Sequence, residues 1–112
     1  MEKKLDTMLI HGVEEDHSGA VSMPIYQVST FRQHMVGQKG GYQYSRVSNP
    51  TRSALEYQMA LLEGGIRGFA FGSGMAAITA VFNLFKAGDH IVASDHLYGG
   101  TSRVLDRVFS RY

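Results

Sequence analysis

A turn of two glycines and a serine separates a short apolar run from a longer, helix-periodic run in residues 69–82, FAFGSGMAAITAVF. The first run is short enough for a buried strand, and an apolar face recurs at helical spacing after the turn. The stretch HIVAS, residues 90–94, predicts a second strand. Strand, glycine turn, helix and strand make a βαβ unit, which predicts an α/β fold with a parallel sheet covered by helices on both faces.

Two further helices are indicated by turn residues and periodicity. Asn49-Pro50 predicts a helix start, because asparagine caps free backbone donors and proline suits the first helical position. Gly64-Gly65 predicts the end of that helix. Apolar residues at helical spacing predict a last helix that includes residues 104–112.

The chain before the first of these helices differs in character. Residues 1–48 are punctuated by glycine and only weakly periodic, and the stretch PIYQVSTF (24–31) is rich in β-branched and aromatic residues. We interpret residues 1–48 as an extended arm that clasps a partner, and residues 49–112 as the incomplete start of a larger domain. Two parallel strands cannot form a covered sheet, and the last helix reaches Tyr112 without a stop signal. We therefore expect the N-terminal part of a longer polypeptide.

Composition excludes several classes of function. A net charge of +1 with scattered basic residues gives no stripe for nucleic acid. The absence of cysteine excludes a disulfide framework and agrees with a cytoplasmic location. Residues 69–85 are apolar but too interrupted for a membrane span. Asp89-His90 and Asp95-His96 repeat an acid–imidazole pair, but with no other spaced ligands we predict no metal site.

The glycine turn has three interpretations when it is considered alone. A strand that turns tightly into a helix aims the free N–H groups of the helix at one point, where the helix dipole favours an anion. Gly72, Gly74 and Ala77 satisfy the pattern G-x-G-x-x-A of nicotinamide-dinucleotide domains, and Asp95 stands where such a fold holds a ribose hydroxyl. Another phosphate ligand fits the turn equally well. The third interpretation is a helix start whose glycines serve packing only.

Three ordered motifs decide between these interpretations: GYQYSRVSNPT (41–51), GSGMAAI and DHLYGGT. Together they resemble the pyridoxal-phosphate enzymes of cysteine and methionine metabolism, the cystathionine lyase and synthase family of fold type I. The resemblance runs along nearly the whole chain. It implies that the fold is the N-terminal portion of the fold type I transferase fold, and that Ser73, Gly74 and Met75 bind the phosphate of pyridoxal 5′-phosphate.

The resemblance also implies roles for residues outside the glycine turn. Tyr44 and Arg46 match the residues that reach the same phosphate from a neighbouring subunit, and Tyr98 matches the aromatic residue stacked on the pyridine ring. A phosphate monoester carries roughly two negative charges near neutral pH, so a guanidinium beside it is chemically apt. Taken singly, Tyr44 and Tyr98 would be packing residues and Arg46 a surface charge. Under the resemblance, Asp95 loses its ribose role and becomes a strand-end residue.

The chain lacks other groups that this chemistry needs. In the family, the lysine that binds the cofactor covalently, the acid on the pyridine nitrogen and the arginine for the substrate carboxylate lie beyond the matching residues. The lysines present do not match the lysine motif: Lys3, Lys4, Lys39 and Lys86. We therefore expect the 112-residue chain alone to be inactive. A fragment that only assists assembly or holds the cofactor is the alternative of another class.

Two sequence features bear on the substrate within the family. Gly100 stands where methionine γ-lyases characteristically carry cysteine, and PIYQVSTF is most similar to bacterial cystathionine γ-lyases. The resemblance implies cleavage of cystathionine to cysteine, 2-oxobutanoate and ammonia, with Tyr98 as an acid or base near the leaving sulfur. Cystathionine γ-synthase and O-acylhomoserine sulfhydrylase stay open as alternatives. The resemblance also implies a cytoplasmic homo-oligomer built from clasped dimers, namely a homotetramer, that acts on a sulfur amino acid.

Overall fold

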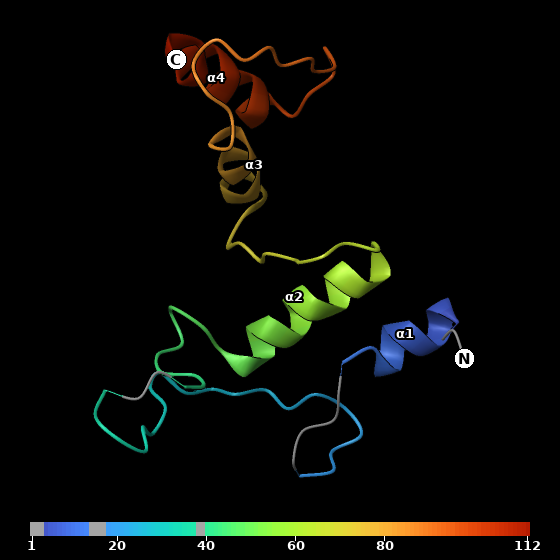
Figure 1. The fold of residues 1–112 in the computed structure, drawn as a ribbon. Coiled ribbons are helices and arrows are strands. Elements are labelled where there is room, and N and C mark those ends of the chain that lie inside the picture. Colours follow the sequence, from blue (N-terminus) through green and yellow to red (C-terminus); the bar gives the residue numbers. More distant parts are fainter. Residues whose placement is uncertain (1–3, 14–17, 38–39) are drawn as a thin grey trace. The chain divides into compact units, whose positions relative to one another are not determined.

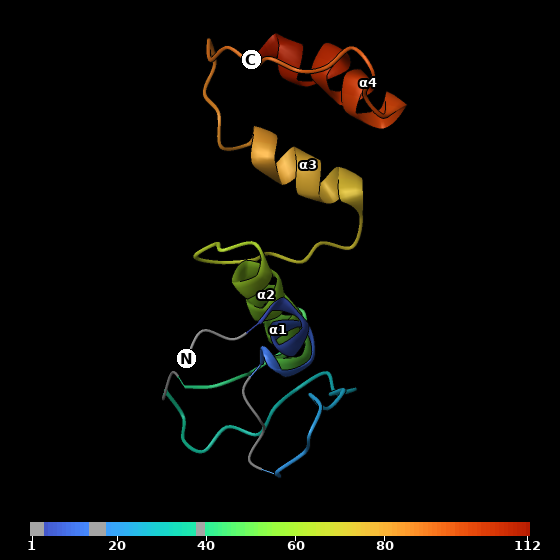
Figure 2. The same ribbon diagram turned by 90° about the vertical axis from the view of Figure 1, so that its right-hand side faces the viewer.

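The computed structural model describes residues 4–13, 18–37 and 40–112. Two compact units are distinguished, Met1–Ala70 and Phe71–Tyr112. Figures 1 and 2 show the helices that each unit contains. The predicted division at residue 48 concerns contacts with another subunit, and it stays a prediction.

The first unit contains helices α1 (Leu5–His11) and α2 (Pro50–Leu62), which lie beside each other (Figures 1 and 2). Helix α1 corrects the sequence analysis, which predicted an extended arm throughout residues 1–48. A seven-residue helix is too short to be stable by itself. It is supported instead by α2, where the Gln58 side chain donates a hydrogen bond to the Met8 carbonyl. A weakly periodic segment therefore becomes helical through tertiary contact.

Helix α2 begins and ends as predicted. The Asn49 side chain caps its N-terminus and Pro50 occupies the first turn. At the other end Gly64 has a φ of +62°, a conformation that side chains disfavour, and the Gly65 N–H donates to the Ala60 carbonyl at 2.8 Å. Ala54 and Ala60 are the buried apolar residues of the part of the chain that is described.

The second unit contains α3 (Gly74–Phe82), α4 (Gly99–Arg107) and the short 3₁₀ helix η1 (Phe109–Arg111). Helix α3 confirms the predicted helix after the glycine turn, although it ends three residues before Phe85. The predicted last helix is present as α4 and η1. The rings of Phe82 and Phe109 pack edge to face at 5.3 Å between centroids, which joins the end of α3 to η1.

The two predicted strands are not formed. Within residues 4–13, 18–37 and 40–112 the only β-pairing is an isolated antiparallel bridge between Thr30 and Tyr44. A strand requires a neighbouring strand for its backbone N–H and C=O groups, and neither residues 69–71 nor residues 90–94 make a backbone–backbone pairing with another described segment. Their apolar side chains remain accessible, with Phe69 68% and Val92 90% exposed.

None of the helices in the described ranges is long and apolar enough to cross a membrane.

Candidate functional site

Tyr44 and Arg46 lie on a turn that leads into α2. Tyr44 forms the bridge to Thr30, and its carbonyl accepts hydrogen bonds from the N–H groups of Val47 and Ser48 at 2.9 and 3.0 Å. The Arg46 guanidinium carbon lies 4.9 Å from the centroid of the Tyr44 ring, within the range of a cation–π contact. The structure therefore brings these two predicted phosphate ligands together, with Tyr44 half-buried and Arg46 exposed.

The N-terminus of α2 holds this turn in place. The Asn49 side-chain oxygen accepts from the Thr51 N–H at 2.8 Å, and its amide donates to the Tyr26 carbonyl at 3.1 Å and to the Ser45 hydroxyl at 2.9 Å. The Thr51 hydroxyl in turn accepts from the Tyr26 N–H at 2.8 Å. The start of α2 thus binds both the turn, through Ser45, and the segment before it, through Tyr26.

The glycine turn has the geometry of an open helix start. Ser73 caps α3, and its hydroxyl oxygen accepts from the Ala76 N–H at 3.1 Å. The N–H groups of Gly74 and Met75 have no acceptor among the described residues. A Cβ added at Gly72 or Gly74 would meet nothing within 4 Å. Among the described residues, therefore, no contact requires glycine at either position.

Tyr98 and Met75 meet at Gly100, near the start of α4. A Cβ added at Gly100 would lie 2.7 Å from Tyr98 Cε1 and 2.9 Å from Met75 Sδ. The Thr101 hydroxyl lies 3.9 Å from the same sulfur, and the Thr101 N–H donates to the Tyr98 carbonyl at 2.8 Å. The Tyr98 ring itself is largely exposed. Two predicted cofactor residues, Met75 of α3 and Tyr98 just before α4, thus share a neighbour.

The predicted site residues fall into two groups that belong to different units. Tyr44 and Arg46 lie in the first unit, whereas residues 73–75 and Tyr98 lie in the second. Their predicted roles, including the reach of the first group to a neighbouring subunit, stay predictions.

Sequence reasoning missed the side chains that support the turn at residues 44–47. Arg52 donates to the carbonyls of Arg46 and Val47, and Glu56 accepts from the Ala70 N–H at 3.0 Å. Their spacing of four residues on α2 is typical of a helical ion pair and was the available signal. It could not reveal which backbone atoms the pair would bind.

The acid–imidazole pairs do not form a metal site among the described residues. His96 Nε2 lies 3.8 Å from Asp95 Oδ1, and both side chains are almost fully exposed. No group of three or more possible metal ligands is present in those ranges. Asp95 and His96 therefore form a weak surface contact.

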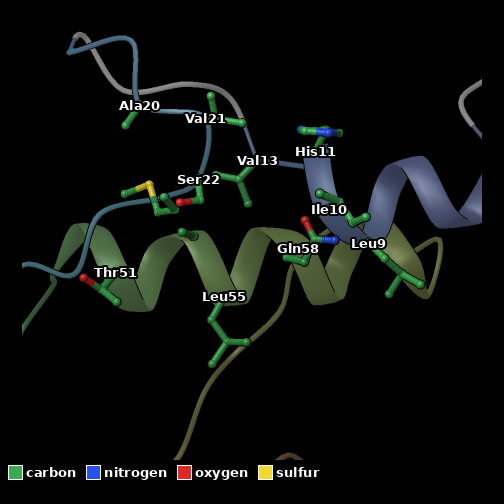
Figure 3. Close-up of a pocket in the computed structure, with 12 residues that line it drawn as sticks. Leu9, Ile10, His11, Val13, Ala20, Val21, Ser22, Thr51, Leu55 and Gln58 are labelled. Carbon is green, nitrogen blue, oxygen red and sulfur yellow. The ribbon is translucent and has the colours of Figure 1, made fainter.

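A pocket of about 510 Å³ lies between α1, residues 20–23 and α2 (Figure 3). Leu9, Ile10 and Leu55 give much of its wall an apolar character. Neither arginine nor lysine is among its described lining residues, and none of the predicted cofactor residues contributes to it. The pocket is therefore not a candidate phosphate site.

Comparison with known proteins identifies relatives along nearly the whole chain. It is 56% identical over 113 residues to a cystathionine γ-lyase of Bacillus subtilis and 55% identical over 109 residues to a cystathionine β-lyase of Lactococcus lactis. These matches cover 99% and 96% of the chain, which spans 29% of the length of each relative.

Solved structures show the same fold. The crystal structure of cystathionine γ-lyase from Lactobacillus plantarum, complexed with L-serine, matches 98% of this chain with a TM-score of 0.85 and 54% identity. The structure of metB from Corynebacterium glutamicum matches 98% with a TM-score of 0.86 and 43% identity. The chain covers 29% and 30% of those two chains. The chain therefore shares its fold with the matched 29% of a cystathionine γ-lyase.

The profile of one family, described as Cys/Met metabolism PLP-dependent enzyme, matches residues 6–112. That match confirms the resemblance carried by the three sequence motifs. The chain belongs to the family of pyridoxal-phosphate-dependent enzymes of cysteine and methionine metabolism.

Proposed function

We propose that the intact protein is a pyridoxal-phosphate-dependent carbon–sulfur lyase that acts on cystathionine, most like cystathionine γ-lyase. The observation that carries this proposal is 56% identity to a cystathionine γ-lyase along 99% of the chain. Within the intact protein, the predicted site residues of this chain would hold the phosphate and the pyridine ring of the cofactor. Family membership also favours pyridoxal phosphate over a nicotinamide dinucleotide as the ligand of the glycine turn.

The open helix start fits a phosphate group. The unpaired N–H groups of Gly74 and Met75, together with the Ser73 hydroxyl, would donate to phosphate oxygens, and the α3 dipole would favour the negative charge. The empty space at Gly72 and Gly74 lets an anion approach the backbone closely. These features support the predicted roles of Ser73, Gly74 and Met75.

Tyr44 and Arg46 would supply the cation that the glycine turn lacks. Arginine can hold two phosphate oxygens at once, and the contact with the Tyr44 ring limits the freedom of its guanidinium. We propose that this pair acts on the phosphate bound by a neighbouring subunit. In that arrangement residues 1–48 are the clasp and residues 49–112 begin the cofactor-binding domain.

Tyr98 would lie against the flat face of the cofactor. Tyr98 is 74% exposed, which leaves its ring accessible for stacking on a ligand. Its phenol could donate or accept a proton near the leaving sulfur. The bound cofactor supplies an electron sink for breaking the C–H and C–S bonds, while this chain's residues bind and orient it.

The predicted parallel sheet belongs to the same proposal. Phe69, Phe71 and Val92 lie on the two segments expected to be strands, and all three are exposed. Exposed apolar runs of this kind need covering. We propose that they pair with further strands in the intact protein, as in fold type I. A cytoplasmic homotetramer likewise stays a prediction.

A second reaction is favoured by a specific observation. The relative that is 55% identical over 109 residues is named cystathionine β-lyase, so the identities do not separate γ- from β-elimination. The reaction products do separate them, because γ-elimination from cystathionine yields cysteine and 2-oxobutanoate, whereas β-elimination yields homocysteine and pyruvate. Incubating the intact protein with cystathionine and identifying the keto acid decides between them. If no keto acid forms and cystathionine accumulates from cysteine and an O-acylhomoserine, the γ-synthase alternative is correct.

The composite site can be tested by complementation. Replacing Arg46 by alanine removes the phosphate's proposed cation and should weaken cofactor retention by about 2 to 4 kcal/mol if the pair is desolvated. Chains carrying Arg46→Ala are then co-expressed with chains carrying Tyr98→Ala, each of which should be nearly inactive as a homo-oligomer. A mixed dimer carries both defects in one site and neither in the other, so up to about half of the wild-type activity should return. If mixed dimers form without recovery, Arg46 serves the site of its own chain.

A further inference from the structure

Arg52 on α2 binds the backbone of the turn that carries Arg46. Its Nη1 donates to the Arg46 carbonyl at 3.5 Å, and its Nη2 donates to the Val47 carbonyl. The buried Nε atom makes no hydrogen bond, but lies 3.5 Å from Glu56 Oε1. The side chain is about a third exposed, so the guanidinium is only partly screened by water.

Glu56, the other member of this ion pair, binds the segment of residues 68–70. Its Oε1 accepts from the Ala70 N–H at 3.0 Å. The same segment also packs tightly on the backbone of α2, because a Cβ added at Gly68 would lie 2.3 Å from the Glu56 carbonyl oxygen. Residues 68–70 lead along the chain directly into the glycine turn.

We propose that Arg52 and Glu56 are positioning residues for the predicted phosphate ligands on or just after these two segments. The pair joins the turn of Tyr44 and Arg46 to residues 68–70, and so connects the two segments that lead to the predicted phosphate ligands. Arg52 acts through the carbonyls of residues 46 and 47 and orients the turn from which the Arg46 side chain projects. This inference rests on the proposed function of Arg46.

The test measures cofactor affinity and local hydrogen exchange in the intact protein. Arg52→Met keeps a long side chain but removes its donors, so exchange in peptides covering residues 43–48 should accelerate about tenfold, and the dissociation constant for pyridoxal phosphate should rise by a similar factor. Arg67→Met is the matched control, because Arg67 is exposed and its side chain has no ion pair with a described residue. It should change neither quantity.

Glu56→Gln provides a second, milder variant. It keeps an oxygen for the Ala70 N–H but removes the charge that faces Arg52. The turn should therefore loosen less than in Arg52→Met, with residues 68–71 exchanging at their original rate. Circular dichroism of each variant verifies that its helices are retained.

Arg46→Ala separates failure of this inference from failure of the proposed function. If Arg46→Ala weakens cofactor binding but Arg52→Met does not, the positioning role is wrong and the phosphate role of Arg46 stands. If neither substitution affects cofactor binding, the proposed phosphate role of Arg46 fails and the inference falls with it. Unchanged exchange in residues 43–48 of Arg52→Met also overturns the inference, whatever the cofactor affinity.

Discussion

Replacing Asn49 by alanine should loosen the whole turn before α2. Its side-chain oxygen caps the helix by accepting from Thr51, a bond whose loss costs about 1 kcal/mol. Its amide makes two part-buried hydrogen bonds, to Tyr26 and Ser45, each worth about 1 kcal/mol. The sum of about 3 kcal/mol corresponds to about a hundredfold change in a local opening equilibrium.

Hydrogen exchange in the intact protein measures this effect directly. Amides of residues 51–54 should exchange about a hundredfold faster in Asn49→Ala, or at the unprotected rate if their protection is smaller than that. Asn49→Asp keeps an oxygen at the cap but removes both donors, so it should lose about 2 kcal/mol. Amides of α4 provide an internal control. A change below about threefold in Asn49→Ala, or about 0.7 kcal/mol, would refute the assignment of this network to Asn49.

Substitutions of three glycines should have distinct effects. Gly68→Ala would place a Cβ 2.3 Å from a backbone carbonyl of α2 and should lower the free energy of unfolding by about 1 to 3 kcal/mol, measured by urea titration. Gly72→Ala enters open space and should leave that energy unchanged, but should weaken pyridoxal-phosphate binding if the anion approaches there. In Gly100→Ala the atoms nearest the new Cβ belong to the Tyr98 ring and the Met75 sulfur, which can move, so the substitution should alter the absorbance of the bound cofactor without reducing helix content.

The sequence predicted the helices better than the sheet, for a physical reason. The α2 cap at Asn49, the stop at Gly64 and the α3 cap at Ser73 act within a few residues, so sequence patterns capture them. Helix α1 was missed because its stability comes from contact with α2, which lies some forty residues later. The strand at 69–71 was expected from hydrophobic pattern, but hydrogen-bonded pairing depends on distant neighbours.

The candidate site shows the same division between local and distant information. The motifs singled out residues 44–46 and 73–75, and the structure places Tyr44 against Arg46 within a single turn. The sequence could not reveal that Arg52 binds the carbonyls behind that turn, since a helical arginine four residues before a glutamate is commonly a surface ion pair. Nor could it predict that Gly100 faces Tyr98, because that contact depends on side-chain direction at the start of α4.

Ser73, Gly74, Met75 and Tyr98 lie at the start of a helix, whereas Tyr44 and Arg46 lie on the turn that leads into α2. Arg46 precedes α2, Ser73 caps α3, and Tyr98 occupies the position before α4. Bonds that span five or fewer residues, such as Ser73 to Ala76 and Arg52 to the Val47 carbonyl, fix much of each local geometry. Such geometry does not require a completed sheet, whereas the distances between the segments do depend on distant contacts. Under the proposed function, formation of the cofactor site is therefore the assembly of locally formed segments, two helix starts and one turn, around one phosphate.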